Sequence, residues 1–369
     1  MGGDIAAWCA LRGLKVTLQD QGIDRIQPAL ARAQTLFAKR LRDPYARRAA
    51  QDRLIPDPMG HGMAHADLII EAIFEDLNAK HALLHDIEKR ARFDAVVASN
   101  TSSLRLEDLR SVMQRPERLV GIHFFNPVAM MPLVEVVETD GVDRNALQRA
   151  LQFVRAIDKL PLPVKSAPGF LVNAVLAPYM LAAMRKLDAG LSACEIDQAL
   201  LDFGMPMGPL TLADTVGLDI ALAAGRSLAA EHPAGATKTS AGAAPPDAKS
   251  GGTNRAIAAV PRCLQERVNA GHLGKKTGQG FYTWKDGRAT GPGNQPHVQQ
   301  APVSASARAL AEELVAPLVN RAQELVASGL VADADLADAG VIFGTGFAPF
   351  RGGPLHWQDS TRNSKGLES

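Results

Sequence analysis

The first 165 residues alternate short apolar, β-branched runs with longer segments of helical periodicity. This alternation is typical of a mostly parallel sheet with helices on both faces, because parallel strands need a crossover connection that is usually a helix. The predicted strands are Val16–Gln19, Leu54–Pro56, Leu68–Ala72, Val96–Ser99, Leu119–Phe124 and Leu133–Val137. The predicted helices between them are 24–42, 76–92 and 143–158.

After Pro168 the pattern changes to Ala- and Leu-rich helical segments without strand signals. A stretch near 233–253 is rich in Ala, Gly, Pro, Ser and Thr, so it offers little apolar surface to bury and is predicted to be an insertion. Helical patterns resume at 256–270 and at 305–328. We therefore expect an α/β domain followed by two helical domains, with the bounds 1–165, 166–286 and 287–369.

Composition and charge exclude several classes of protein. The formal net charge of +1 gives no electrostatic argument for binding nucleic acid or an anionic membrane. No apolar run reaches the roughly 18 residues of a membrane span, and the start of the chain lacks signal-peptide features. The three cysteines, Cys9, Cys194 and Cys263, lie far apart without metal-ligand spacing, which indicates reduced thiols in the cytoplasm and predicts no metal site.

The opening stretch "MGGDIAAWCALRGLKVTLQD" is typical of the second half of a dinucleotide-binding βαβ unit. Gly2 takes the place of the last glycine of a G-x-G-x-x-G turn, where a helix N-terminus attracts a pyrophosphate. Asp20 follows the next strand at the spacing of a carboxylate that binds a ribose 2′-hydroxyl, which favours NAD over NADP. Taken alone, Asp20 is also compatible with an ordinary surface carboxylate after a strand.

The strand and most of the turn that should precede this stretch are absent from the sequence. In a doubly wound sheet that strand lies at the centre, so the Val16 and Leu68 strands are expected to lose the neighbour between them. We expect a start codon assigned too late, or a fragment of a longer reading frame, in preference to a shortened protein.

Three later stretches place polar groups at strand ends, the edge at which open α/β sheets bind ligands. They are "ASNTSS" with Ser102, "GIHFFNP" with His123 and "PLVEVVE" with Glu135. A neutral imidazole can take a proton from an alcohol, and a carboxylate beside it fixes the tautomer and stabilises the charged form. Each residue alone is equally typical of a core histidine, a turn serine or a solvated strand glutamate.

Together these stretches resemble the 3-hydroxyacyl-CoA dehydrogenase family, and in particular the dehydrogenase part of the bacterial multifunctional fatty-acid β-oxidation α subunit. The serine of the family's S-N-T-S-S turn matches Ser102, and the histidine of its G-[IL]-H-F-F-N-P motif matches His123. The family's glutamate, twelve residues later, matches Glu135, and the asparagine of P-G-F-[LI]-V-N matches Asn173. The segments "GMPMGPLTLADTVGLD" and "GFAPFRGGP" are similar to the two C-terminal helical repeats of that family.

The resemblance implies a Rossmann-type α/β domain and an NAD-dependent oxidation of (S)-3-hydroxyacyl-CoA to 3-ketoacyl-CoA. In this hypothesis His123 is the general base, Glu135 orients it, and Ser102 and Asn173 bind the substrate oxygens. Glu75 and Lys80 are expected near the nicotinamide ribose, and Asn100 is expected to contact the cofactor as well. The implied partners are an acyl-CoA thioester and either a second copy of the chain or a thiolase subunit.

Two other functions remain open at this point. The chain could be a catalytically impaired fragment that binds acyl-CoA or a partner subunit through its helical repeats. It could also be a dehydrogenase of the β-hydroxyacid or UDP-sugar type, although those enzymes use a lysine-centred site and the His–Glu spacing here favours the first hypothesis.

Overall fold

The computed structural model describes residues 1–231, 260–290 and 305–366, and these residues form two compact units. The first unit comprises Met1–Phe170 with Ser328–Leu336, and the second comprises Leu171–Ala327 with Ala337–Ser369. The insertion predicted near 233–253 lies outside the described residues. The three-domain division of the sequence stays a prediction.

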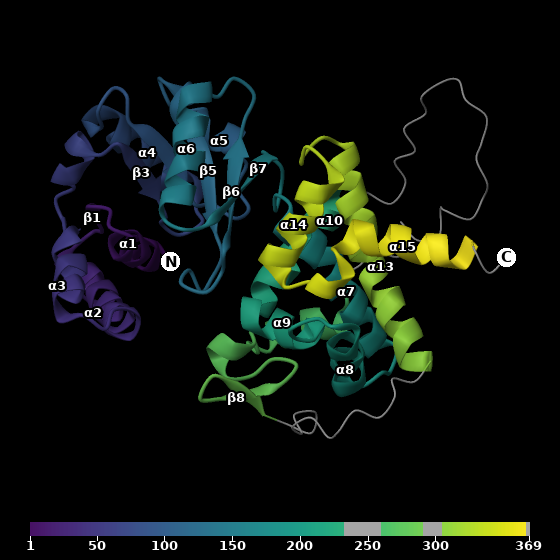
Figure 1. Ribbon diagram of the computed structural model, residues 1–369. Helices are drawn as coiled ribbons and strands as arrows, with labels where there is room; N and C mark the ends of the chain where they lie inside the picture. Colours follow the sequence, from purple (N-terminus) through teal and green to yellow (C-terminus); the bar gives the residue numbers. More distant parts are fainter. Residues whose placement is uncertain (232–259, 291–304, 367–369) are drawn as a thin grey trace, which may run out of the picture. The chain divides into compact units, whose positions relative to one another are not determined.

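A five-stranded sheet forms the centre of the first unit (Figure 1). Its strands follow the order β3-β4-β5-β6-β7, and every neighbouring pair is parallel except β5 and β6, which are antiparallel. Their bounds are β3 Leu68–Glu71, β4 Val96–Ser99, β5 Leu119–Phe124, β6 Leu133–Glu138 and β7 Leu160–Lys165. This mostly parallel sheet, flanked by helices, confirms the predicted Rossmann-type α/β class.

A separate two-stranded parallel sheet pairs β1 (Val16–Leu18) with β2 (Leu54–Pro56). Among the described residues no strand lies between β1 and β3. Three helices accompany this sheet, with the bounds α1 Gly2–Leu11, α2 Ile23–Arg40 and α3 Pro44–Arg53 (Figure 1). The helix predicted over 24–42 is therefore present.

The sequence analysis missed α3, although its start carries a recognisable signal. The Asp43 carboxylate accepts hydrogen bonds from the backbone N–H groups of Tyr45 and Ala46, and Pro44 occupies the first helical position. Aspartate at the N-cap followed by proline is a standard helix start, because proline has no N–H to leave unpaired there.

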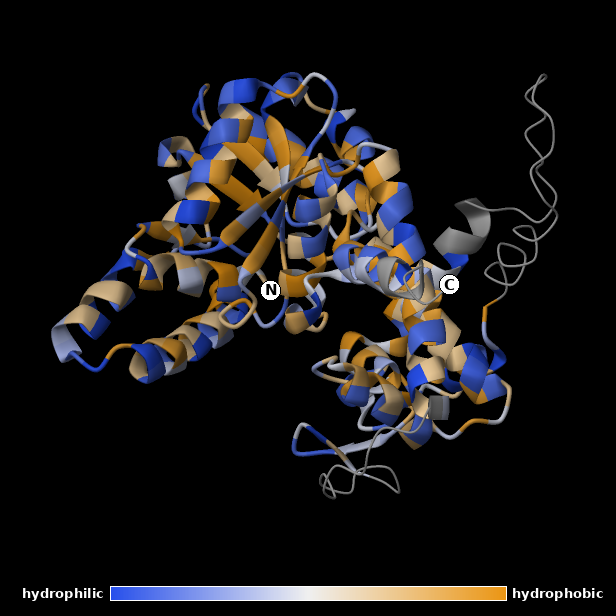
Figure 2. Cartoon of the chain, turned by 45° about the vertical axis from the view of Figure 1, so that its right-hand side comes forward, coloured by the Kyte–Doolittle hydropathy of each residue, from blue (hydrophilic) through white to orange (hydrophobic). Residues whose placement is uncertain are grey.

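The core of the first unit lies where α1 and α6 (Arg144–Ala156) cover one face of the five-stranded sheet. Ile5 and Trp8 of α1 pack with Val154 of α6 against apolar side chains of the strands. Figure 2 shows the strands in the colours of hydrophobic residues and the outer sides of the helices in hydrophilic colours. The remaining helices of this unit are α4 Leu77–Arg90, α5 Leu106–Arg110, and the short 3-10 turns His61–His65 and Pro116–Arg118.

Strand β7 was also missed, because its sequence Leu-Pro-Leu-Pro-Val-Lys carries two prolines. Proline cannot donate to a sheet ladder, so a strand that contains it is normally demoted. Here β7 is the outermost strand of the sheet, paired only with β6 among the named strands, and Pro161 and Pro163 are tolerated at this edge.

The second unit consists mainly of helices and includes one hairpin, β8 (Thr283–Lys285) with β9 (Arg288–Thr290). Helices α7 and α13 pack along each other. The helix bounds are α7 Val172–Asp188, α8 Ala193–Phe203, α9 Pro209–Val216, α10 Leu218–Glu231, α12 Arg262–Asn269, α13 Ala305–Ala327, α14 Ala334–Thr345 and α15 Pro354–Gly366, with 3-10 turns at Lys275–Thr277 and Pro349–Arg351. No helix in the described ranges has the length and apolar character needed to cross a bilayer.

Two helices of this unit begin against a buried aspartate in the same way. Asp197 accepts hydrogen bonds from the first backbone N–H groups of α9, and Asp338 accepts them from those of α15. Gly208 and Gly353 precede these helices, and a Cβ at either position would lie within 2.3 Å of the aspartate side chain. The same contact at the starts of α9 and α15 is what two related helical repeats would produce.

We predict that Gly121→Ala destabilises the first unit. Gly121 of β5 is paired with Val137 of β6, and an added Cβ would lie 2.7 Å from the Val137 Cβ. Overpacking of this kind is expected to lower the free energy of unfolding by about 1–3 kcal/mol. Urea unfolding at neutral pH measures the change, and an unchanged midpoint and slope would contradict the close approach of the two strands.

Candidate active site

His123 and Glu135 form a buried hydrogen-bonded pair at the antiparallel junction of the sheet. The two residues lie directly opposite each other in the β5–β6 register, so their side chains project from the same face. The distance from His123 Nδ1 to Glu135 Oε2 is 2.7 Å, and the residues are 3% and 0% exposed. The carboxylate thereby fixes the ring orientation and leaves Nε2 for other groups.

Two aromatic rings surround the imidazole of His123. The Phe125 ring lies edge-on with its centroid 4.6 Å away, and the Phe170 ring lies 5.5 Å away. Phe170 has a φ of 49°, in the left-handed region that bulky residues avoid, and it is fully buried. Such strain costs about 1–3 kcal/mol and persists only where surrounding packing fixes the residue, which is common at functional sites.

The serine turn after β4 is organised by Glu75. One carboxylate oxygen of Glu75 accepts hydrogen bonds from the Thr101 hydroxyl at 2.6 Å and from the backbone N–H groups of Ser102 and Ser103 at 2.9 and 3.0 Å. Burial disfavours the charged carboxylate, but these hydrogen bonds and the nearby Lys80 outweigh it and lower the pKa of Glu75 to about 2. The position of Ser102 is therefore fixed by the hydrogen bond from its backbone N–H to Glu75.

Lys80 connects this turn to the end of β3. Its buried ammonium lies 2.8 Å from Glu71 Oε1 and 3.3 Å from Glu75 Oε2. The other oxygen of Glu71 accepts a hydrogen bond from the Ser99 hydroxyl at 2.6 Å. Because buried ions are tolerated only with partners, these four side chains form one interdependent network.

Asn100, which the sequence assigned to the cofactor, bridges two strand ends. Its side-chain Oδ1 accepts a hydrogen bond from the backbone N–H of Phe124 at 2.9 Å. This bond holds the residue after β4 against the last residue of β5, one position beyond His123. Contact between Asn100 and a cofactor stays a prediction.

The other sequence-predicted residues lie in separate places. Gly2 is the first residue of α1, and a Cβ there would lie 3.3 Å from the Cβ of Ala72, just after β3. Asp20 is exposed two residues after β1, and its carboxylate accepts a hydrogen bond from the backbone N–H of Gln21 at 2.7 Å. Asn173 lies in the first turn of α7, in the second unit, and its role stays a prediction.

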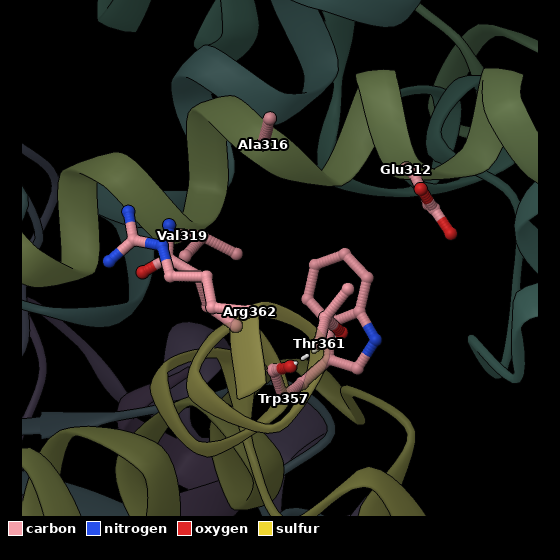
Figure 3. A pocket seen from close by; sticks show the side chains of 7 residues that line it. Glu312, Ala316, Val319, Trp357, Thr361 and Arg362 are labelled. Carbon is pink, nitrogen blue, oxygen red and sulfur yellow. Dashed lines mark hydrogen bonds between the residues drawn. The ribbon is translucent and has the colours of Figure 1, made fainter. Parts of the chain in front are cut away.

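The second unit has a groove between α13 and α15, and none of the predicted site residues lines it (Figure 3). Trp357 forms one wall, with Glu312 and Arg362 among the charged residues at its rim. We assign no role in the reaction to this groove.

Sequence reasoning overlooked Glu71 and Phe170. Glu71 ends the apolar strand Leu-Ile-Ile-Glu, and a carboxylate at the end of a buried strand, nine residues before a lysine, was a usable signal. Phe170 carried no such signal, since its left-handed backbone depends on packing that the sequence does not reveal.

The chain thus combines an α/β unit, which holds the His123–Glu135 pair, with a helical unit, and comparison with known families agrees with this two-part organisation. Residues 1–167 match the NAD-binding domain of 3-hydroxyacyl-CoA dehydrogenase, and residues 169–284 match the C-terminal domain of the same enzyme. The chain belongs to the 3-hydroxyacyl-CoA dehydrogenase family.

Individual relatives support this membership. The chain is 34% identical over 374 residues to the fatty acid oxidation complex subunit alpha of Shewanella loihica, an alignment that covers 98% of this chain and 49% of the relative. The chain thus spans about half the length of the curated relatives it matches.

Solved structures show the same relationship. The (S)-3-hydroxybutyryl-CoA dehydrogenase PaaH1 of Ralstonia eutropha is 31% identical, with a TM-score of 0.67 over 78% of this chain and 96% of that one. The 3-hydroxybutyryl-CoA dehydrogenase of Escherichia coli K12 has a TM-score of 0.78 over 98% of this chain and 89% of that one, and at 24% identity it supports the fold alone.

We predict that Glu75→Gln flattens the acid limb of the stability curve. Glu75 has a pKa of about 2 in the folded chain and 4.5 ordinarily, so its stabilisation is complete above the ordinary value and is lost as the pH falls towards 2. The wild-type free energy of unfolding should therefore fall more steeply across this window than that of the variant. Urea unfolding at a series of acidic pH values measures both slopes.

The matched control is Asp140→Asn, which removes an exposed carboxylate from the same unit. Equal slopes for wild type and Glu75→Gln would contradict the hydrogen bonding described for the serine turn.

Proposed function

We propose that this chain oxidises (S)-3-hydroxyacyl-CoA to 3-ketoacyl-CoA with NAD⁺, as the names of its relatives suggest. The observation that carries the proposal is the buried His123–Glu135 hydrogen bond of 2.7 Å at the carboxyl end of β5. A histidine oriented by a buried carboxylate is the arrangement that general-base removal of an alcohol proton requires.

In this mechanism His123 takes the proton of the substrate 3-hydroxyl on Nε2, while Nδ1 stays hydrogen bonded to Glu135. The carboxylate of Glu135 favours the imidazolium that results and keeps the ring from turning. The rings of Phe125 and Phe170 restrict the space around the imidazole and limit the access of water. Ser102 and Asn173 are proposed to hydrogen-bond the substrate oxygens.

The described residues that fit NAD lie around the carboxyl ends of β1 and β3. Helix α1 begins at Gly2, so its first N–H groups and its dipole suit the cofactor's pyrophosphate. Asp20 is exposed after β1, where a carboxylate can accept hydrogen bonds from a ribose and repel a 2′-phosphate. Bound NAD⁺ supplies the hydride acceptor. Glu75 and Lys80 are proposed to border the nicotinamide ribose, and Asn100 to line the same region.

Partners and location are part of the proposal. The curated relatives are alpha subunits of a fatty acid oxidation complex, which supports assembly with a thiolase subunit, and a homodimer is the alternative. The three free cysteines agree with the cytoplasm as the proposed location.

We predict that His123→Gln lowers turnover by about a hundredfold to ten-thousandfold, because the variant loses both the general base and the partner of Glu135. The measurement is NADH formation from (S)-3-hydroxybutyryl-CoA, followed by its absorbance. The matched control is His85→Gln, an exposed histidine on α4 that should keep wild-type turnover.

The same assay separates the proposal from its alternative. The assay is run on the chain as given and on a chain extended upstream in its own reading frame. If both bind acyl-CoA but neither forms NADH, the binding-module hypothesis is supported and the dehydrogenase proposal is wrong. Near-normal turnover of His123→Gln would remove His123 from the mechanism.

A further inference from the structure

Lys159 precedes β7 and turns its ammonium group into the protein. The residue is 6% exposed, and its Nζ donates hydrogen bonds to the backbone carbonyls of Val128 at 2.6 Å and Met131 at 2.5 Å. A buried ammonium is costly unless its donors are used, and here two of three N–H groups bind carbonyl oxygens.

The two carbonyls belong to the loop 125–132, which joins β5 to β6. The next backbone N–H, that of Leu160, donates to the carbonyl of Pro132 at 2.9 Å, so Lys159 and Leu160 together fasten the loop at three places. The loop closes the hairpin that places His123 opposite Glu135. Fastening the loop therefore restricts how far the two strand ends can move apart.

A second set of contacts links Lys159 to helix α1. Its Nζ lies 4.2 Å from the centre of the Trp8 ring, and the Trp8 indole N–H donates to the Ile157 carbonyl at 2.9 Å. Arg40, at the end of α2, donates to the Ala129 carbonyl of the same loop at 3.0 Å. The loop beside the catalytic pair and the first helix of the unit thus share one anchoring point, Lys159.

The charges that face Lys159 are mostly positive, which makes its position costly. Burial, together with the positive charges of Arg12 and Arg40, lowers the pKa of Lys159 to about 8, and Asp158 opposes this shift. A side chain needed only to fill space would be apolar at this position. The hydrogen bonds that the Lys159 ammonium donates to the loop explain why an amine occupies this position.

We propose that Lys159 is a positioning residue that holds the loop between β5 and β6 and thereby keeps His123 against Glu135. Its catalytic consequence rests on the proposed dehydrogenase function, whereas its effect on the loop does not. Lys159 binds backbone carbonyls of this loop and therefore acts on the pair through the backbone.

The experiment compares wild type with Lys159→Met, which keeps the side-chain length and removes all donors. Lys165→Met is the matched control, because Lys165 is an exposed lysine at the other end of β7. Hydrogen–deuterium exchange of the full chain is followed for the loop 125–132 and for α6. Loss of two charge-assisted hydrogen bonds should speed loop exchange about tenfold or more in Lys159→Met, with α6 and the control unchanged.

A spectroscopic readout follows the catalytic pair directly. The proton between His123 Nδ1 and Glu135 gives a far-downfield ¹H NMR signal, assigned by its loss in His123→Gln. We expect Lys159→Met to shift or broaden this signal and Lys159→Arg to restore it. In the NADH assay, Lys159→Met should lower kcat about tenfold or more without changing the KM for NAD⁺, because small misplacements of a reacting group are costly.

Unchanged loop exchange and an unchanged signal in Lys159→Met would overturn the proposal. Exchange that accelerates throughout the unit would also overturn it, since Lys159 would then serve general stability. If Lys159→Met does not fold, Lys159→Gln is measured in the same way. Wild type without NADH formation would refute the proposed function, while the exchange and NMR results still decide the role of Lys159.

Discussion

The hydrogen bond between His123 and Glu135 depends on one antiparallel pair in an otherwise parallel sheet. Side chains alternate between the two faces of a strand, so a slip of one residue between β5 and β6 would turn the imidazole and the carboxylate to opposite faces. Close packing of Gly121 on Val137 and the fastened loop 125–132 both fix this register. The chemistry of the site is thus a property of strand pairing.

The buried charges of the first unit gather around the strand ends. Lys80 lies between Glu71 and Glu75, and Lys159 lies among backbone carbonyls and the Trp8 ring. Charges removed from water are kept only where partners compensate them. The partners of Lys159 come from the loop 125–132 and from α1, and those of Lys80 come from the end of β3 and the segment after it. These groups orient turns and loops that apolar packing alone leaves free to adopt several conformations.

Much of this architecture could be predicted from local patterns. The strands Val96–Ser99 and Leu119–Phe124 begin and end at the predicted residues, because continuous apolar runs bounded by polar residues mark buried strands. Strand β7 could not be predicted because it contains two prolines. Proline is tolerated in a strand at the edge of a sheet, and the sequence does not show which strand lies there. The partners of Lys159 are backbone carbonyls of a distant loop, which no spacing in the sequence reveals.

Asp197 and Asp338 hold the starts of α9 and α15 by the same hydrogen bonds, although the connecting segments differ in length. Eleven positions separate Asp197 from Gly208, and fifteen separate Asp338 from Gly353. Because the anchoring contact is made at the end of each connection, extra residues can be accommodated without displacing the helix that follows. Evolution can therefore lengthen or recompose these connections while the helical framework keeps its geometry.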